Sequence, residues 1–358
     1  MKFKNITIDD GLSRINKPTG IGNYSKLLLQ SLQSYIAKNE DNINVKYRDY
    51  SFFYLFPRKL RRLLYLFLIN LFGLTEKAGI FHFTNYYTPI VKKRGLRYIV
   101  TIHDMAAWEF PQAFSPDYLK FIRSVIKRGI YKSDSIITVS QSVKSEICNI
   151  FSVPENKICV CHNAVKPIFK SFNSTGKDRY ILFVGIIAPQ KNLSTLIGAF
   201  AKLKNKPKYG NLKLVISGKK DSGMAELESA IRMRSLEKHV SILGYITDSE
   251  MVRLYNNAQA LVIPSLYEGF GIPIIEAMAC RVPVIASDIP VFREIAGDAA
   301  LFYGHPRDQN LLCEAIDKVL SDESLKGNLI SRADKQVLKY TWENVAKNHL
   351  EAYNIACA

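Results

Sequence analysis

The sequence predicts an α/β protein with two doubly wound domains, each a parallel sheet between layers of helices. Short apolar runs alternate regularly with segments whose apolar residues recur at helical spacing, which is typical of such sheets. The length of 358 residues suits two domains of ordinary size. A polar, turn-rich stretch at 170–177 reads as the linker. We therefore expect one domain over 1–170 and a second over 177–335.

The elements of the first domain follow from short apolar runs bounded by polar or glycine residues. A glycine turn, Gly20 to Asn23, precedes a helix with apolar residues at helical spacing, and Ser140 reads as the cap of another helix. His162 and Asn163 follow the last strand, and we interpret Asn163 as mainly structural. We expect strands at 2–8, 45–50, 79–84, 97–102, 135–139 and 158–161, and the first helix at 24–37.

The second domain repeats the alternation. We expect strands at 180–185, 213–217, 240–243, 260–264, 282–287 and 300–302, and helices at 193–203, 226–235, 248–256, from Pro273 onward, and at 342–355. In such folds ligands bind at the carboxyl ends of the strands, so the turns that follow the strands are where functional residues are expected.

Glu268 and Glu276 lie on either side of a glycine loop that ends at Pro273. Proline suits the first turn of a helix, and glycine suits backbone that approaches a ligand closely. A glycine loop and a helix N-terminus together attract anions, because unpaired N–H groups and the helix dipole point at them. Backbone amides can bind phosphate, and carboxylates can bind sugar hydroxyls. Together they predict a ligand with both phosphate and sugar groups.

A second feature is the turn 185–192, which follows a strand and contains Lys191. A cation in such a turn can neutralise the negative charge of a phosphate or diphosphate group.

The run 264–278 resembles the Glu-x7-Glu signature of glycosyltransferase family 4, the retaining enzymes that use nucleotide sugars. The stretches 281–295 and 297–302 extend the match. The resemblance implies a GT-B fold, in which two Rossmann-like domains face a cleft. It also implies that a C-terminal helix within 340–358 packs back on the first domain.

The resemblance assigns roles to residues of the second domain. Glu276 would bind the ribose hydroxyls, Glu268 the hexose hydroxyls and Lys191 the diphosphate. The remaining donor contacts would come from Gly269, Phe270, Gly271 and Ile272.

From the first domain, the resemblance implies contacts by the loop with Gly20 and Gly22 and by His103, at the end of a strand. His103, Glu268 and Lys191 are therefore the expected catalytic residues. Front-face attack on the donor would need no side-chain base, and we expect no metal and no cofactor.

The chain departs from the family pattern in one respect. Relatives usually carry an arginine just after the glycine or just before the lysine of the 185–192 turn, where this chain has Ile186 and Gln190. One positive charge is therefore missing. Lys219, Lys220 or Arg293 would compensate, or the site is weakened.

The net charge of +17 is concentrated in the first domain. Residues 1–170 hold 26 Lys and Arg against 12 Asp and Glu, whereas 171–358 hold 23 against 20. Such an excess implies an anionic partner for the first domain. No nucleic-acid-binding motif is present, so nucleic acid is not expected.

The segment 52–74 suggests that this partner is a membrane. Its apolar part is shorter than the roughly 20 residues that span a bilayer. Basic residues beside aromatic and aliphatic ones are typical of an interfacial helix; the alternative is a core helix with one charged face. The cations are Arg58, Lys59, Arg61 and Arg62, and the same face would include Lys92, Lys93, Arg94, Arg97, Lys120, Arg123, Lys127 and Arg128.

These observations predict a retaining hexosyltransferase, with mannose from GDP-mannose as the first choice. Rhamnose, fucose, glucose and N-acetylhexosamine donors remain open. The expected acceptor is a lipid-diphosphate-linked oligosaccharide or polysaccharide of O-antigen, capsule or other surface-glycan synthesis. Six cysteines without framework spacing, which we read as structural free thiols, and no signal peptide predict a cytoplasmic protein on the inner face of a bacterial plasma membrane.

Three other classes remain open. The missing arginine is compatible with a catalytically weakened, nucleotide-sugar-binding partner subunit. A GT-B sugar-nucleotide epimerase would need no acceptor. A basic membrane or nucleic-acid binder on a vestigial scaffold would not bind nucleotide sugars.

Overall fold

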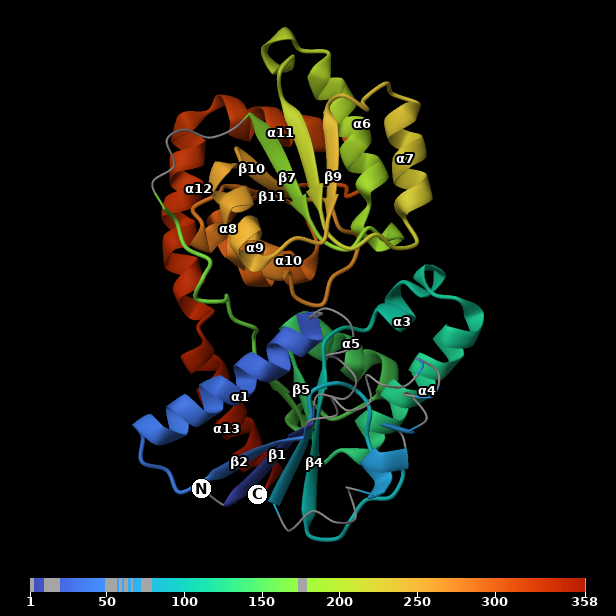
Figure 1. Cartoon of the computed structure of the whole chain (residues 1–358), viewed down its shortest axis with the longest axis vertical. Helices are drawn as coiled ribbons and strands as arrows, with labels where there is room; N and C mark the ends of the chain where they lie inside the picture. Colours follow the sequence, from blue (N-terminus) through green and yellow to red (C-terminus); the bar gives the residue numbers. More distant parts are fainter. Residues whose placement is uncertain are drawn as a thin grey trace. The chain divides into compact units, whose positions relative to one another are not determined.

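The computed structural model describes residues 3–9, 20–48, 57, 60, 64–65, 67–71, 79–172 and 179–357. The chain divides into two compact units, each with helices on both sides of a sheet (Figure 1). The first unit comprises 1–108, 114–163 and 341–358, and the second comprises 109–113 and 164–340.

The sheet of the first unit is parallel, in the order β2-β1-β3-β4-β5-β6. Its described strands are β1 (Asn5–Asp9), β2 (Asn44–Arg48), β3 (Gly79–Phe83), β4 (Leu96–Ile102), β5 (Ser135–Thr138) and β6 (Ile158–Val160). The helices are α1 (Gly20–Lys38), α3 (Ala106–Glu109), α4 (Pro116–Lys132), α5 (Gln141–Phe151) and α13 (Trp342–Ala356), with the 3-10 turn η3 (Glu155–Lys157). The 3-10 turn η2 (Pro111–Ala113) lies in the stretch 109–113, which groups with the second unit.

The sheet of the second unit is also parallel, in the order β12-β11-β10-β7-β8-β9. Its strands are β7 (Tyr180–Val184), β8 (Lys213–Ser217), β9 (Val240–Gly244), β10 (Ala260–Ile263), β11 (Val284–Ser287) and β12 (Ala300–Tyr303). The helices are α6 (Leu193–Lys204), α7 (Met224–Arg232), α8 (Asp248–Asn257), α9 (Ile272–Ala279), α10 (Pro290–Ala296), α11 (Gln309–Ser321) and α12 (Glu323–Gln336). Short 3-10 turns are η4 (Pro189–Lys191), η5 (Pro207–Tyr209), η6 (Gly297–Ala299) and η7 (Val337–Lys339).

Both sheets have the burial expected of parallel sheets covered on both faces. Every residue of β5, β10 and β11 is buried, and in β4 only Arg97 is exposed. Continuous apolar runs are what such strands need, which explains why the sequence predicted them well.

In the second sheet, the chain runs outward from β7 through β8 to β9 and then resumes at β10 on the other side of β7. This reversal is a topological switch point, where the loops after two adjacent strands diverge and leave a crevice. The carboxyl ends of β7 and β10 are therefore the place to look for a ligand site.

The predicted glycine turn at Gly20 to Asn23 is wrong, because these residues form the first turn of α1. Local pattern cannot separate a glycine turn from a helix start, because glycine is compatible with the backbone angles of both. The helix predicted over 226–235 ends at Arg232, and Ser235 has a left-handed φ of 53°. Sequence analysis did not identify α4, α11 or α12.

The C-terminal helix α13 packs on α1 within the first unit. The Tyr24 hydroxyl lies 2.7 Å from His349 Nε2, and Lys38 forms a 2.8 Å ion pair with Glu343. His349 Nδ1 lies 2.7 Å from the Val345 carbonyl, which can only accept, so Nδ1 carries the proton. The Tyr24 hydroxyl therefore donates to Nε2, and α13 fixes the first turns of α1.

The segment 52–74 is described only at 57, 60, 64–65 and 67–71, so its four predicted cations lie outside the described residues. Tyr65 and Ile69 are fully buried in the core of the first unit, as the core-helix interpretation requires. The Tyr65 hydroxyl also donates to Asp9 Oδ1 over 2.8 Å. Phe67 and Leu71 are exposed, so the opposite face of this helical segment is apolar as well.

Throughout the described ranges, each helix is too short or too polar to cross a lipid bilayer.

Candidate functional site

Lys191 and Glu268 meet at the switch point of the second sheet. Lys191 closes the turn after β7, Glu268 follows β10, and Lys191 Nζ lies 2.6 Å from Glu268 Oε1. The two side chains are only 15% and 18% exposed. Ser265 Oγ also donates to Glu268 Oε1, over 3.0 Å. A partly desolvated pair of this kind is held in one geometry more firmly than a surface pair.

Asn192 joins the two loops that carry this pair. Its Nδ2 donates to the carbonyls of Pro264, over 3.0 Å, and Pro306, over 2.7 Å. The backbone N–H of Leu266 also donates to the Gln190 carbonyl, over 2.8 Å. Sequence analysis did not single out Asn192: its place before a helix suggests a cap, but its side chain makes no cap hydrogen bond and instead bonds to carbonyls far along the chain.

The ammonium of Lys191 carries three donors, so it can bind a diphosphate oxygen while it remains bonded to Glu268. Glu268 in turn has a second carboxylate oxygen, Oε2, for a sugar hydroxyl. The pair can therefore place the charge of a leaving diphosphate and a hexose hydroxyl side by side.

The loop between the glutamates turns into α9 at Gly271, whose φ of 104° is unfavourable for other residues. A Cβ there would also approach a ring carbon of Phe292 to 3.0 Å. Phe270 is buried and lies edge-on to Tyr340, with ring centroids 5.8 Å apart. The loop is thus rigid, and it carries the amides of 269–272 to the N-terminus of α9, where anions are stabilised.

Glu276 is buried one turn into α9. Tyr255 donates to its Oε2 over 3.0 Å. Burial raises the pKa of Glu276 to about 7, although the Tyr255 hydrogen bond and nearby Lys166 favour the charged form. Asp248, which pairs with Lys166 at 2.9 Å, opposes ionisation. Such a carboxyl is poised to gain its charge when a ligand supplies hydroxyl donors.

His103 follows β4 in the first unit. Its Nε2 lies 2.8 Å from the Thr84 carbonyl, so Nε2 carries the proton and donates. The Tyr24 ring packs edge-on against the imidazole, 4.9 Å between centroids. Burial lowers the pKa of His103, so the ring is neutral near pH 7, and Nδ1 remains as an acceptor for a ligand hydroxyl.

Gly20 and Gly22 belong to the first turn of α1, and their surroundings lie outside the described residues. They place the N-terminus of a helix in the first unit.

Two of the cations proposed to replace the missing arginine, Arg293 and Lys219, have other partners. Arg293 makes a two-pronged ion pair with Asp288, at 2.6 and 2.7 Å, and its guanidinium lies 4.2 Å from the centre of the Phe302 ring. Lys219 is 70% exposed and lies 3.8 Å from Asp221. Lys220, the third of these cations, is exposed.

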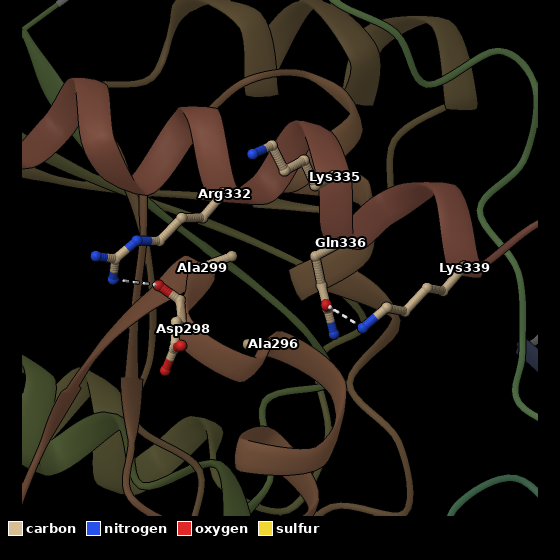
Figure 2. Close-up of a pocket in the computed structure, with 7 residues that line it drawn as sticks. All are labelled: Ala296, Asp298, Ala299, Arg332, Lys335, Gln336 and Lys339. Atoms are coloured by element: carbon tan, nitrogen blue, oxygen red, sulfur yellow. Dashed lines mark hydrogen bonds between the residues drawn. The ribbon is translucent and has the colours of Figure 1, made fainter.

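A hollow of about 320 Å³ lies elsewhere in the second unit, between α12 and the turn that follows α10 (Figure 2). Arg332 donates to the Asp298 carbonyl over 3.2 Å, and Lys339 donates to Gln336 Oε1 over 2.8 Å. This hollow precedes β12, at the amino edge of the sheet, whereas the Lys191–Glu268 pair lies at the carboxyl edge. It is not part of the candidate site.

Two family models match the chain. The model described as "Glycosyl transferases group 1" matches residues 165–336, and the model described as "Glycosyltransferase Family 4" matches residues 32–168. The O-antigen chain mannosyltransferase RfbU of Salmonella typhimurium is 34% identical over 266 residues, 73% of this chain and 69% of that protein. An uncharacterized glycosyltransferase of Methanocaldococcus jannaschii is 32% identical over 275 residues, 72% and 69% of the two chains.

Solved structures show the same fold. Sucrose-phosphate synthase from Thermosynechococcus elongatus superposes with a TM-score of 0.76 at 19% identity, over 98% of each chain. Anabaena HepE in complex with UDP and glucose superposes with a TM-score of 0.71 at 16% identity, over 97% of this chain and 98% of that one. The fold of the chain is GT-B, as its sequence predicted.

Proposed function

Because the chain belongs to glycosyltransferase family 4, we propose that it transfers a hexose from a nucleotide sugar to a glycan acceptor with retention of configuration. The observation that carries this proposal is the Lys191–Glu268 pair at the switch point, followed by buried Glu276 on α9. Our first choice of donor is GDP-mannose, because relatives are named O-antigen mannosyltransferases. The acceptor would then be a lipid-diphosphate-linked oligosaccharide of surface-glycan synthesis.

The proposed chemistry needs positioning and charge stabilisation more than a side-chain base. The acceptor oxygen bonds to the anomeric carbon while the bond from that carbon to the phosphate oxygen breaks. The electron pair leaves with the β-phosphate, which takes the proton of the acceptor hydroxyl. Lys191 and the N-terminus of α9 stabilise the developing charge, and Glu268 orients the hexose.

Donor binding can be tested by thermal unfolding with a panel of nucleoside diphosphates and nucleotide sugars. We expect GDP and GDP-mannose to raise the Tm and other bases to have little effect, because a ligand at about 100 times its Kd adds about 2.7 kcal/mol of stability. If no nucleotide or nucleotide sugar of the panel stabilises the folded protein, the donor-site proposal is contradicted. Isomerised donor in the absence of acceptor would instead identify an epimerase.

We also propose that the first unit binds an anionic membrane. The basic-apolar patch consists of four exposed apolar side chains and three neighbouring cations: Phe67, Leu71, Ile90, Val91, Lys92, Lys93 and Arg94. The backbone N–H of Ile90 donates to Asn70 Oδ1 over 2.6 Å, which brings the two apolar parts together. Apolar groups at the acyl boundary and cations at the headgroups are how peripheral proteins hold a membrane.

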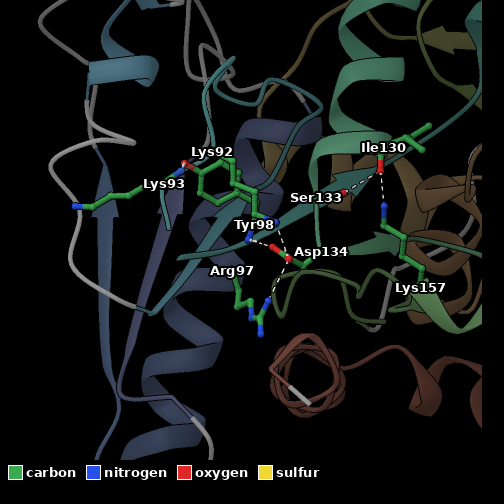
Figure 3. A network of polar contacts seen from close by, with 8 residues as sticks. All are labelled: Lys92, Lys93, Arg97, Tyr98, Ile130, Ser133, Asp134 and Lys157. Carbon is green, nitrogen blue, oxygen red and sulfur yellow. Dashed lines mark hydrogen bonds and ion pairs between the residues drawn. The ribbon is translucent and has the colours of Figure 1, made fainter. Parts of the chain in front are cut away.

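The surroundings of the patch add to its positive charge. Lys92 and Arg97 share a single carboxylate, Asp134, at 2.6 and 3.4 Å (Figure 3). Lys157, on the next strand connection, donates instead to the Ile130 carbonyl over 2.9 Å. One acidic group among these cations leaves a net positive surface for lipid phosphate.

Vesicle sedimentation tests the patch. Wild type should bind phosphatidylglycerol-containing vesicles and not pure phosphatidylcholine, and the Ile90→Ser/Arg94→Glu variant should bind about 10- to 100-fold less. The matched control is Leu338→Ser, which removes a 70% exposed side chain from the second unit and should have no effect. Equally weak binding of wild type to both vesicles would sink the proposal.

A further inference from the structure

We propose that Tyr255 is a positioning residue for donor binding, which acts through Glu276 by holding its carboxylate in the form that ribose hydroxyls recognise. The inference rests on the proposed nucleotide-sugar site and adds to it a fully buried residue. Tyr255 lies near the end of α8 and Glu276 lies within α9, and Figure 1 shows these two helices side by side.

The Tyr255 hydroxyl has one proton and two acceptors within reach. It lies 3.0 Å from Glu276 Oε2 and 3.4 Å from the carbonyl of Pro273. Burial and the neighbouring Glu276 carboxyl raise the pKa of the Tyr255 phenol well above its ordinary value, so the phenol keeps its proton. A phenol donates more strongly to a carboxylate than to a neutral carbonyl. The contact therefore favours the ionised form of Glu276.

A buried phenol does not by itself require a carboxylate as its partner. One hydrogen bond usually satisfies a buried tyrosine, and the Pro273 carbonyl offers a neutral acceptor. The carboxyl, in contrast, needs the phenol: burial raises the pKa of Glu276 to about 7, and the Tyr255 hydrogen bond favours the charged form. The arrangement therefore serves Glu276 more than it serves Tyr255.

The contact with Tyr255 leaves the other carboxylate oxygen of Glu276 for a ligand. Within the described part of the chain, no hydrogen bond reaches Oε1, and Oε1 is not among the enclosed atoms that lack a partner. Glu276 is 9% exposed, whereas Tyr255 is fully buried. With Oε2 held from α8, a hydroxyl donor from outside can reach the carboxylate at Oε1.

Tyr255 is itself held in one place. Its ring lies edge-on to Phe169, with ring centroids 5.8 Å apart. The side-chain amide of the next residue, Asn256, donates to the Lys170 carbonyl over 3.1 Å, and its oxygen accepts from the Phe172 backbone N–H over 2.9 Å. These contacts fix the end of α8 to the chain before β7, so the phenol has a defined direction.

Two charged side chains act on the same carboxyl in opposite directions. Lys166 Nζ lies 2.9 Å from both carboxylate oxygens of Asp248, the first residue of α8. Lys166 favours the ionised form of Glu276, and Asp248 opposes it. Cys280, which follows α9, acts on the Tyr255 phenol. Among these groups, the Tyr255 hydroxyl contributes most in favour of the charge on Glu276.

The first test measures the ionisation of Glu276 in the full chain without any nucleotide. Carbon-13 NMR of protein labelled at the glutamate carboxyl carbons follows it, and the signal missing from Glu276→Gln identifies it. Tyr255→Phe keeps the ring and its packing but removes the donor. The midpoint of ionisation, about pH 7 in wild type, should rise to about pH 8 or above.

The matched control is Tyr180→Phe, which removes another buried hydroxyl that donates to α8, at the Leu254 carbonyl over 2.6 Å. It should leave the midpoint unchanged. Asp248→Asn should lower the midpoint, because the Lys166 charge then acts on Glu276 without its opposing neighbour. An equal midpoint in wild type and Tyr255→Phe would overturn the inference.

The second test is isothermal titration with GDP-mannose, or with the nucleotide sugar that the thermal panel selects. Relative to wild type, Tyr255→Phe should bind about tenfold more weakly at pH 6, about fivefold at pH 7 and within about threefold at pH 9. The loss shrinks with rising pH because Glu276 becomes ionised in both proteins. Tyr180→Phe should bind as wild type does at each pH.

A loss of the same size at every pH would show that Tyr255 only supports packing, which would overturn the inference. If wild type bound no nucleotide sugar at all, the proposed function would fail. The carboxyl titration would still decide whether Tyr255 sets the charge of Glu276, because it needs no ligand.

Discussion

Replacing Lys191 with alanine is expected to lower kcat/KM about 10²- to 10³-fold, the largest loss that a single substitution in the second unit should cause. Removing one donor to the developing charge commonly costs about this much. The change also leaves Glu268 without its 2.6 Å counterion in a site that is mostly shielded from water. That carboxylate would then repel the diphosphate of the donor.

Initial rates and donor affinity should be measured for Lys191→Ala beside a matched control, Lys219→Ala. Lys219 lies in the turn after the neighbouring strand β8, is 70% exposed and should change neither quantity. In the Lys191→Ala/Glu268→Gln double variant, nucleotide affinity should partly recover while turnover stays low. Turnover of Lys191→Ala within about threefold of wild type would show that the diphosphate is held elsewhere.

Glu276→Gln is expected to weaken nucleotide-sugar binding about 30- to 100-fold, because the charge-assisted hydrogen bonds that we propose Glu276 makes to the ribose would become neutral ones. Glutamine keeps the size of the side chain and can still accept the hydrogen bond from Tyr255. The loss should therefore report on the ligand contact rather than on packing.

The same carboxyl should make donor affinity depend on pH. Burial raises the pKa of Glu276 to about 7 in the free protein, whereas ribose hydroxyls bind its ionised form. Below that pKa a proton must leave before the donor binds. Wild-type affinity should therefore fall about tenfold from pH 8 to pH 6, and the Glu276→Gln affinity should stay constant.

Isothermal titration with an intact nucleotide sugar is the suitable measurement, because its diphosphate has no terminal group that titrates near neutral pH. A glutamate in the unfolded chain ionises near pH 4.3, whereas Glu276 in the folded protein ionises only near pH 7. The folded state therefore loses stability as the pH rises from about 4.3 to about 7. Glu276→Gln should consequently be at least as stable as wild type at pH 8. If donor affinity depends on pH in the same way in wild type and Glu276→Gln, Glu276 does not bind the ribose.

Much of this protein was predictable from its sequence. Most strands of both sheets are apolar runs covered on two faces, so local composition located them to within a few residues. Glu268, Glu276 and Lys191 could be selected because carboxylates, a cation and glycines follow strands, where parallel sheets place their ligands. Helix starts were less certain, and α1 begins four residues earlier than predicted, because glycine is compatible with both a turn and a first helical turn.

The features that only the tertiary structure decided depend on contacts between residues far apart in the chain. The 2.6 Å Lys191–Glu268 pair joins loops 77 residues apart, and Asn192 holds those loops together through two carbonyls. The charge state of Glu276 depends on burial and on Tyr255, which no local pattern contains. Tyr87, in the loop after β3, likewise meets Phe121 of α4, with ring centroids 6.4 Å apart. Sequence pattern reports the chemistry available at each strand end, whereas charge state and partner are set by neighbours that only folding brings together.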